Sequence, residues 1–480
     1  MANLMLPGNP RYQPQSLVPF FGYDNLFRTV AEVEIATLRT LGEFGVIPLD
    51  EIRELTPDDE RLLLNITTSD VVEVERKITK HDLRAWVRIA SARLSAKRVA
   101  RWLHIPLTSY DALDTARVLQ FARAHQQVVA SQLRDVIRVL IGLVRRHAVV
   151  LQIGRTHGQH ALPITVGFWL ATILNRLMSC ARALDQRAAD LVGKISGAVG
   201  AHNAQVALGL VSSGLNRPTF EECVLHRLGL RPASISTQIL PPEPLARYLF
   251  ECCLLSATLG QFGRDCRNLM RSEIREVAEQ YEAGQVGSST MAHKRNPVTF
   301  ENLEGTWLKT KNEFGKVLDT LISEHQRDLV GSSLLRDDPT IIVNLVHQLE
   351  SLLRTNEAGV PFLRRLTVDE AACRRHFNES AGDVLAEPLY IFLQMAGYPG
   401  DAHELVNHRI VPLAKQNPHS TLLDAAEELA GSDPELAQAL QNIPEEQLLI
   451  LRNPSSYLGD AVELALRIAD AAEEYLAHTV

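Results

Sequence analysis

The sequence predicts an all-α protein of three helical domains with a central bundle of long helices. Five long segments carry apolar residues three and four positions apart, which places those side chains on one face of a helix. None of the five shows the alternation of apolar and polar residues that is typical of a strand. The five segments are residues 114–150, 163–191, 244–282, 301–325 and 339–363. Helices of this length bury their apolar faces against one another, and often against other subunits.

Shorter helical patterns lie on either side of these segments. A proline-rich start is followed by a helix over residues 23–45 and by further short helices. After the bundle, Pro and Gly breaks separate short helices again. We therefore expect an N-terminal domain over residues 1–110, the bundle over 111–365 and a C-terminal domain over 366–480. Helix caps are expected at Thr79, Asp369 and Asp433, the last with Pro434 in the first helical position.

Composition argues against several classes of protein. A net charge of −8 over 480 residues does not suit a nucleic-acid-binding surface, which needs clustered Lys and Arg. The six cysteines lack the paired spacing of a zinc site and are too few for a disulfide framework in so long a chain. No apolar run reaches the roughly 18 residues of a membrane span, and the first residues do not resemble a signal peptide. We expect a cytoplasmic protein without a nucleic-acid or membrane partner.

A polar segment over residues 284–299 interrupts the bundle. It contains Gly287, the adjacent hydroxyls of Ser288 and Ser289, and the cationic residues Lys294 and Arg295. A Gly just past a helix, followed by residues of this kind, is typical of a surface loop. Considered alone, the loop is either a solvated connector or a binding loop on a rigid scaffold.

Histidines occur at two further breaks between helices. His157 and His160 lie three residues apart, whereas metal-binding pairs on helices are usually four apart, and no third ligand is evident nearby. We therefore expect no metal site. Without a metal, His157 is either a structural histidine or a general acid or base near neutral pH. His81 beside Asp82 is, by itself, typical of a hydrogen-bonded surface pair.

Taken together, these stretches resemble the fumarase/aspartase superfamily, which includes class II fumarase and argininosuccinate lyase. The segment Ser288-Ser289-x-Met291-x-x-Lys294-x-Asn296-Pro297 is similar to the superfamily's signature loop. Within the superfamily, the chain resembles the adenylosuccinate lyase family over nearly its whole length. Further positions match in the expected order: Arg11, Tyr12, Lys80, His81, Asp82, Thr108, Ser109, Thr156, His157, Gly158, Gln238, Arg295, Asn302, Arg327 and Asp328.

The resemblance implies a β-elimination that cleaves a C–N bond and releases fumarate, without a cofactor. The family's substrates are adenylosuccinate, which gives AMP, and the succinylated carboxamide ribotide of purine synthesis (SAICAR, giving AICAR). By analogy, Ser288 is the general base that removes the proton next to a carboxylate, and His157 is the general acid that protonates the departing nitrogen. His81 would assist at the same end of the substrate, oriented by Asp82. Which of the two histidines gives the proton stays open.

The remaining matching residues are expected to bind substrate. Negative charge accumulates on a carboxylate during the elimination, so the site must supply donors aimed at it. Lys294, Asn296 and the loop's backbone N–H groups suit that task, and Arg forks and hydroxyls suit a phosphate. The phosphate candidates are Arg11, Tyr12, Ser333 and Arg336, with Arg295 as a further one, and the other binding candidates are Lys80, Asp82, Thr108, Ser109, Gln238, Ser289, Asn302 and Arg327. In the family, three subunits of a homotetramer assemble each site, and we expect the same here.

The chain departs from the family's pattern at three places. Ala292 stands where the loop usually has Pro. Residues 239–244 (Ile-Leu-Pro-Pro-Glu-Pro) replace an Arg-Asp pair, and Val330-Gly331 replaces more polar residues. These departures leave two alternatives to an adenylosuccinate lyase. One is a paralogous lyase that releases fumarate from another amino-succinyl substrate, and the other is a non-catalytic helical oligomer, against which the presence of Ser288, His157 and Lys294 argues.

Overall fold

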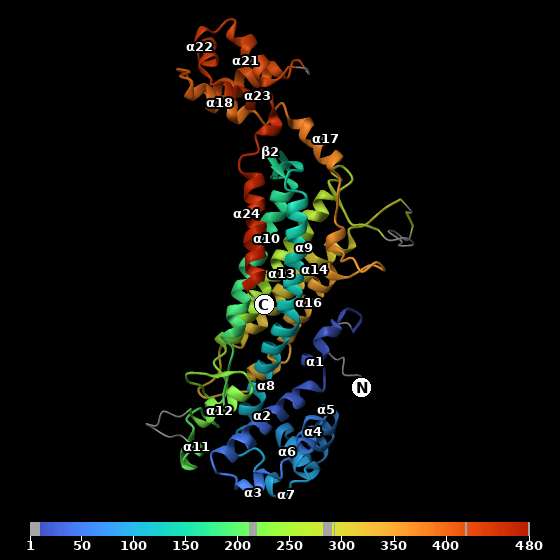
Figure 1. Cartoon of the computed structure of the whole chain (residues 1–480), viewed down its shortest axis with the longest axis vertical. Helices are drawn as coiled ribbons and strands as arrows, with labels where there is room; N and C mark the ends of the chain where they lie inside the picture. The colour runs from blue at the N-terminus through green and yellow to red at the C-terminus, as the bar shows by residue number, and fades with distance from the viewer. Residues whose placement is uncertain (1–9, 211–217, 282–289, 292, 418–419, 479–480) are drawn as a thin grey trace. The chain divides into compact units, whose positions relative to one another are not determined.

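The structure is a computed structural model that describes residues 10–210, 218–281, 290–291, 293–417 and 420–478. The chain divides into two compact units, which are described separately below. Unit 1 comprises Met1–Val136, Ser179–Gly263 and Glu301–Arg354, and unit 2 comprises Ile137–Met178, Arg264–Phe300 and Thr355–Val480. Nearly all regular structure is helical, which confirms the predicted all-α class (Figure 1). The division into three domains stays a prediction.

Four long helices have residues in both units, and they correspond to the predicted bundle segments. They are α9 (Ala130–Arg146), α10 (Val166–Ala189), α13 (Glu243–Leu269) and α14 (Val298–Asp319). The fifth predicted segment is α16 (Pro339–Leu353), which lies in unit 1. No helix in the described ranges is both long enough and apolar enough to cross a membrane.

Several predicted helix ends are wrong, because an apolar residue beyond a helix can be buried in another conformation. The segment predicted as 114–150 is α8 (Ser109–Ala124), a π-helical turn (His125–Val129) and α9, and it ends at Arg146. The segment predicted to reach residue 282 leaves the helix at Leu269, and β5 (Val277–Ala278) then pairs with β6 (Thr367–Val368). The last two segments end at Asp319 and Leu353, short of the predicted 325 and 363.

Unit 1 is built around α2 (Asn25–Glu43) packed against α8, which lie side by side in Figure 1. The ring centroids of Phe21 and Phe121 lie 4.9 Å apart, and Trp86 is fully buried in α6 (Asp82–Arg93). The other elements of unit 1 are α1 (Val18–Phe21), α3 (Leu49–Ile52), α4 (Pro57–Leu64), α5 (Thr68–Val74), α7 (Lys97–Ala100), α11 (Asn203–Ala207), α12 (Phe220–Arg227), α15 (Val330–Leu334), and the parallel pair β3 (Val192–Gly193) and β4 (Arg231–Pro232).

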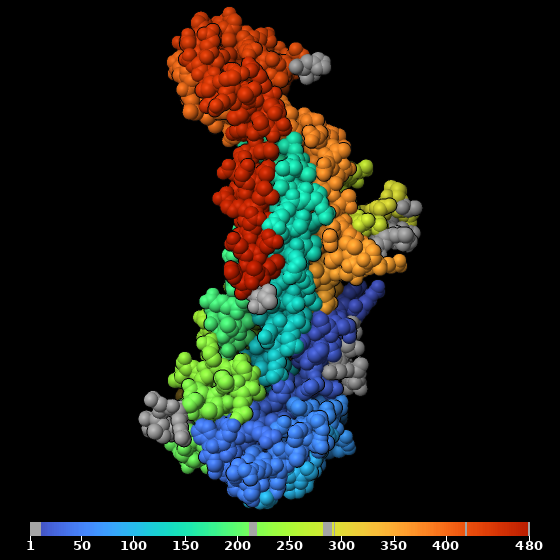
Figure 2. Space-filling view, viewed as in Figure 1, coloured from blue at the N-terminus to red at the C-terminus, as the bar shows by residue number. Residues whose placement is uncertain are grey.

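Unit 2 contains a β-hairpin and a cluster of short helices. The cluster encloses its own apolar core, formed by residues such as Leu389, Leu405 and Leu436, and it is the orange to red body of Figure 2. The helices are α17 (Glu370–Ser380), α18 (Ala386–Met395), α19 (Ala402–Leu405), α20 (Val411–Ala414), α21 (Leu422–Ala430), α22 (Pro434–Asn442), α23 (Glu445–Arg452) and α24 (Ala461–His478). The long α24 is held to α9 by ion pairs from Arg145 to Asp470 and Glu473, each at 2.6 Å.

The hairpin consists of β1 (Leu151–Thr156) and β2 (Gln159–Thr165), and the helical pattern did not predict it. The segment predicted as a helix from residue 163 therefore begins with a strand, and α10 starts at Val166. His157 and Gly158 join the two strands, with φ of 53° and 78°. Positive φ at both residues of a two-residue turn is the signature of a type I′ hairpin, for which Gly is favoured.

Two of the three predicted helix caps are confirmed. The carboxylates of Asp369 and Asp433 accept hydrogen bonds from Ala372 N (2.9 Å) and Leu436 N (3.2 Å). The cap at Thr79 is wrong. Residues Glu75–Thr79 form a π-helical turn, the next residue has φ of 53°, and the N-cap of α6 is His81.

Candidate active site

Four predicted substrate-binding residues lie at the start of α8 and in the loops around it: Thr108, Ser109, Gln238 and Arg327. Gln238 Oε1 accepts a hydrogen bond from Arg327 Nη1 at 2.8 Å. The Arg327 guanidinium also stacks on the ring of Tyr110, 3.3 Å from its centroid. The Tyr110 hydroxyl is in turn 3.0 Å from the hydroxyl of Ser332. The structure thus brings together Gln238 and Arg327, which are far apart in the sequence, beside the helix start that carries Ser109.

A buried ion pair holds this helix start in place. Asp111 and Lys194 are both fully buried and form an ion pair. The same carboxylate accepts hydrogen bonds from the backbone N–H of Thr108 (2.8 Å), Ser196 (3.1 Å) and Gly197 (3.2 Å). A carboxylate near a helix N-terminus is also favoured by the helix dipole. The position of Thr108, immediately before the helix, is therefore set by Asp111.

The Lys80-His81-Asp82 segment lies at the N-terminus of α6. Lys80 has a left-handed backbone conformation, and His81 follows as the N-cap residue. His81 Nδ1 is 3.2 Å from Asp82 Oδ1, which is the orienting contact expected from the sequence. Both side chains are more than two-fifths exposed. An exposed imidazole with an adjacent carboxylate is accessible to a ligand, and its ring is held by one hydrogen-bonding partner.

Another group of predicted residues gathers around His347 of α16. Asn302 Nδ2 is 2.9 Å from His347 Nε2, and the Tyr12 ring packs edge-on against the same imidazole at 6.0 Å. Arg11 lies over the Tyr12 ring at 5.6 Å. Burial lowers the pKa of His347, so the ring is neutral at pH 7 and can accept a hydrogen bond from the Asn302 amide. The predicted phosphate candidates Ser333 and Arg336 are both exposed, Ser333 within α15 and Arg336 between α15 and α16.

In unit 2, His157 stands exposed at the tip of the hairpin turn. The strand behind it is anchored by Arg155, whose guanidinium bonds to the fully buried Glu276 at 2.6 Å and 3.1 Å. Burial raises the pKa of Glu276, but hydrogen bonds from Arg155 and Gln152 outweigh that effect and hold the pKa below its usual value. His376 makes a further contact with the same carboxylate at 2.9 Å. His157 therefore projects from a turn whose strand is held by the buried ion pair of Arg155 and Glu276.

The signature loop is described only in part. Ser288, Ser289 and Ala292 lie outside the described residues. Lys294 and Arg295 are exposed, and the Arg295 guanidinium lies 4.8 Å from the Tyr281 ring centroid. Tyr281 also donates a hydrogen bond to the carbonyl of Asn296 at 2.8 Å.

A groove of unit 2 collects positive charge beside these loop residues. Lys294, Arg295 and Asn296 line it together with Arg267, Arg271 and Arg275. Such a concentration of cations favours a dianionic ligand.

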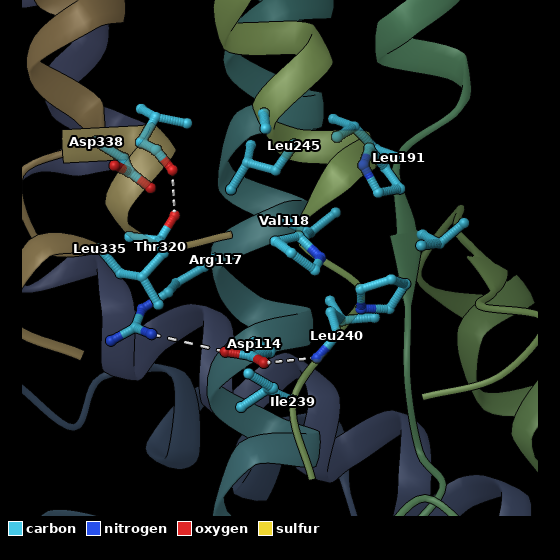
Figure 3. A pocket seen from close by; sticks show the side chains of 16 residues that line it. Asp114, Arg117, Val118, Leu191, Ile239, Leu240, Leu245, Thr320, Leu335 and Asp338 are labelled. Atoms are coloured by element: carbon cyan, nitrogen blue, oxygen red, sulfur yellow. Dashed lines mark hydrogen bonds and ion pairs between the residues drawn. The ribbon is translucent and has the colours of Figure 1, made fainter. Parts of the chain in front are cut away.

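The departing segment after Gln238 lines an apolar cavity in unit 1 (Figure 3). The backbone N–H of Leu240 donates to Asp114 at 3.1 Å, and Arg117 lies 3.6 Å from the other oxygen of that carboxylate. Burial raises the pKa of Asp114. Pro241 and Pro242, which directly precede α13, also line the cavity. The apolar residues that replace the family's Arg-Asp pair are thus packed into a wall beside the Gln238 cluster.

Sequence reasoning missed the partners that hold the predicted residues. Tyr110 and Ser332 adjoin Arg327, and Glu276 supports the His157 hairpin. His347 contacts Asn302 from a position 45 residues away, within a helix whose pattern is otherwise apolar. The composition of the Thr108–Asp111 stretch was the available signal for Tyr110. Nothing in the local sequence marks Ser332, Glu276 or His347.

Comparison with known proteins points to one family. The model of a lyase family matches residues 30–309. The chain is 30% identical to the adenylosuccinate lyase of Archaeoglobus fulgidus over 98% of this chain and 99% of that protein. It is 28% identical to the adenylosuccinate lyase of Streptococcus mutans, with 95% and 98% covered. It is also 30% identical to the N-acetyl-S-(2-succino)cysteine lyase of Dickeya dadantii, with 98% of each covered.

Solved structures share the fold. The fumarate lyase from Mesorhizobium sp. BNC1 superposes with a TM-score of 0.78 at 24% identity, covering 97% of this chain and 99% of that one. The 3-carboxy-cis,cis-muconate lactonizing enzyme from Pseudomonas putida gives 0.75 at 23% identity, with 97% and 98% covered.

Proposed function

We propose a specific reaction for this chain from the premise that it belongs to the lyase family and is a carbon–nitrogen lyase. The reaction is the β-elimination of fumarate from adenylosuccinate to give AMP, and the same cleavage of SAICAR to give AICAR. The observation that carries this proposal is the match to adenylosuccinate lyases over almost the entire length of both chains. The protein then acts in purine nucleotide biosynthesis in the cytoplasm.

The elimination balances with two protein groups. Ser288 takes the proton from the succinyl carbon next to a carboxylate, the C–N bond breaks, and its electron pair goes to the nitrogen, which His157 protonates. Fumarate and the nucleotide amine leave, and the proton returns from Ser288 to His157 through solvent. A serine hydroxyl is a weak acid, so this role needs a polarised site that excludes water.

The other predicted residues stabilise charge and hold the substrate. Lys294, Asn296 and the cationic groove around them suit the carboxylate on which negative charge accumulates. Gln238 and Arg327, which are hydrogen-bonded to each other beside Tyr110, suit the second carboxylate of the substrate or its purine base. The exposed Arg11 and Tyr12 suit the phosphate, together with Ser333 and Arg336.

Turnover of adenylosuccinate tests the proposal directly. The purified chain should convert adenylosuccinate to AMP and fumarate, followed by the ultraviolet change and by separate fumarate analysis. Ser288→Ala should lower kcat by several orders of magnitude, as is usual when a catalytic base is removed, while the circular dichroism and oligomeric state stay unchanged. Ser432→Ala, the same substitution at an exposed serine outside both the loop and the cationic groove, serves as the matched control. If micromolar wild-type enzyme releases neither product, adenylosuccinate is not the substrate.

The pH dependence of turnover in His157→Gln and His81→Gln assigns the proton donor. The variant that removes the donor loses the alkaline limb of the kcat profile, because that limb reports the group that must be protonated. The other variant keeps both limbs and raises KM. If both profiles keep the alkaline limb, neither histidine is the acid.

We propose that the protein is a homotetramer in which Ser288 and His157 of one site come from different chains. Mixing Ser288→Ala with His157→Gln after subunit exchange then creates hybrid sites in which both groups are intact, at about a quarter of all sites by random assortment. Recovered activity near that fraction supports shared sites. No recovery in tetramers shown to be hybrid places both groups on one chain.

A second candidate function has its own support. The chain is as similar to an N-acetyl-S-(2-succino)cysteine lyase as to the adenylosuccinate lyases. The apolar residues 239–242 also stand where the family usually has an Arg-Asp pair, and they line an apolar cavity. This candidate is a lyase that releases fumarate from a different succinylated compound. Fumarate release from N-acetyl-S-(2-succino)cysteine or a succinyl amine, with adenylosuccinate left intact, would establish it.

A further inference from the structure

A cavity of about 70 Å³ lies inside unit 1, between α8, the start of α13, the end of α14 and the start of α16. One side of it is apolar and is formed by Val118, Leu191 and Leu245, as Figure 3 shows. The opposite side carries ionisable groups. A water molecule needs roughly 10–15 Å³, and an engineered cavity of about 150 Å³ holds benzene. The space here therefore suits a molecule of a few non-hydrogen atoms.

Asp338, the residue immediately before α16, is one of two described cavity-lining residues with an unsatisfied buried polar atom, and the other is Arg117 through Nη1. Asp338 is only 4% exposed. Its Oδ1 atom is buried and, among the described residues, has no hydrogen-bond partner. An ionised carboxylate in this state is costly, because burial removes its water without supplying donors. A ligand that donates hydrogen bonds to Asp338 would recover that cost.

Once ionised, Asp338 favours a cationic donor over a neutral one, because a hydrogen bond between two charged groups is the stronger. Burial raises the pKa of Asp338 to about 7, an effect that the nearby Arg117 opposes. Asp337 raises the pKa further and Lys316 lowers it, but those two residues are themselves paired at 3.2 Å.

Inside the cavity, Arg117 lies 3.6 Å from Asp114, so its charge is shared with a second carboxylate. The cavity is therefore lined by two carboxyl groups, Asp338 and Asp114, and by one guanidinium, Arg117. The apolar wall opposite Asp338 is short, so the cation that fits here carries a small alkyl group. We propose that this cavity binds a small primary alkylammonium ion, with its ammonium group on Asp338 and its alkyl chain against Val118 and Leu245. The proposal does not depend on the lyase substrate.

Binding of propylammonium chloride to the full-length protein tests the proposal, by ligand-observed NMR at pH 8 and constant ionic strength. We expect saturable binding in the millimolar range, as about four non-hydrogen atoms allow. Asp338→Asn should weaken it about tenfold or more, since the charge-assisted hydrogen bond is lost. Asp337→Asn, the same substitution at the adjacent exposed carboxylate, should change it less than about twofold. Propan-1-ol should bind about tenfold more weakly than the cation.

A second variant keeps the test decisive if Asp338→Asn does not fold. Val118→Phe fills the cavity from its apolar side and should abolish binding while Asp338 remains. Affinity should also rise between pH 6 and pH 8 as the carboxylate ionises. The proposal is overturned if propan-1-ol binds as tightly as propylammonium, if Asp337→Asn weakens binding as much as Asp338→Asn, or if a crystal structure shows a side chain of another copy inside the cavity.

Discussion

The buried pair of Lys194 and Asp111 offers the sharpest test of how the structure holds its candidate site. Both side chains are fully buried. Lys194→Met keeps the length of the side chain and removes the charge, so Asp111 stays buried without its counter-ion. Breaking such a pair costs about 3–5 kcal/mol. Three backbone N–H groups still bond to Asp111, and we therefore expect the lower end, about 3 kcal/mol.

Urea unfolding measures this cost, with wild type and variant compared at one protein concentration because the stability of the proposed tetramer would depend on that concentration. Lys77→Met is the matched control. Lys77 pairs with Glu73 at 2.7 Å, but both side chains are about two-thirds exposed or more, and an exposed pair of this kind contributes less than about 0.5 kcal/mol. The substitution is chemically identical at both positions, so the difference in lost stability between the two variants measures the effect of burial.

The reasoning would be refuted if Lys194→Met lowered the free energy of unfolding by less than about 1 kcal/mol. It would also fail if the two Lys→Met variants lost stability equally. The site provides a second readout. Asp111 positions Thr108 through a hydrogen bond of 2.8 Å, so Lys194→Met should raise KM even at temperatures where the variant remains folded.

Three further outcomes follow from the structure. The pKa of Asp338 is raised from 3.8 to about 7, so the free energy of unfolding falls as pH rises through that range. The loss is about 1.4 kcal/mol per pH unit, or about 4 kcal/mol in total. Stability of Asp338→Asn, measured from pH 4 to pH 8, should lack that decline. Glu276→Gln leaves Arg155 without its buried counter-ion and should cost about 3 kcal/mol at pH 7. Because the pKa of Glu276 is lowered on folding, the wild-type advantage should vanish on acid titration below the unfolded value of 4.5. Gly200→Ala should cost about 2 kcal/mol or more in urea unfolding, because φ is +74° and an added Cβ would lie 2.0 Å from the carbonyl oxygen of Ser236; an unchanged unfolding midpoint would contradict this.

Helix ends mark one limit of what the sequence alone can predict. The apolar spacing identified α9, α10, α13, α14 and α16, because a helix that buries one face must repeat apolar residues at that period. The same spacing continues past Leu269 toward Val277, which is buried as part of β5. Burial is visible in the pattern, but the backbone conformation that achieves it depends on a strand about 90 residues further along the chain, Thr367–Val368.

The capping positions show the same distinction. Asp369 and Asp433 cap their helices because an acidic side chain reaches the N–H groups of the next turn, which is a local interaction. Thr79 has equal local propensity, but the π-helical turn before it and the left-handed Lys80 move the cap to His81. Local preference alone could not exclude that alternative.

By itself, the sequence determined the helical class and the family, because periodicity and ordered motifs are properties of the chain alone. The predicted site residues were likewise proposed from the sequence alone. Only the tertiary structure decided which groups meet: Gln238 with Arg327 across 89 positions, and Lys194 with Asp111 across 83. It also placed His157 on a type I′ turn supported by Arg155 and Glu276. Such contacts form only when non-local packing compensates the entropy of closing the chain between them, and no local pattern records that balance.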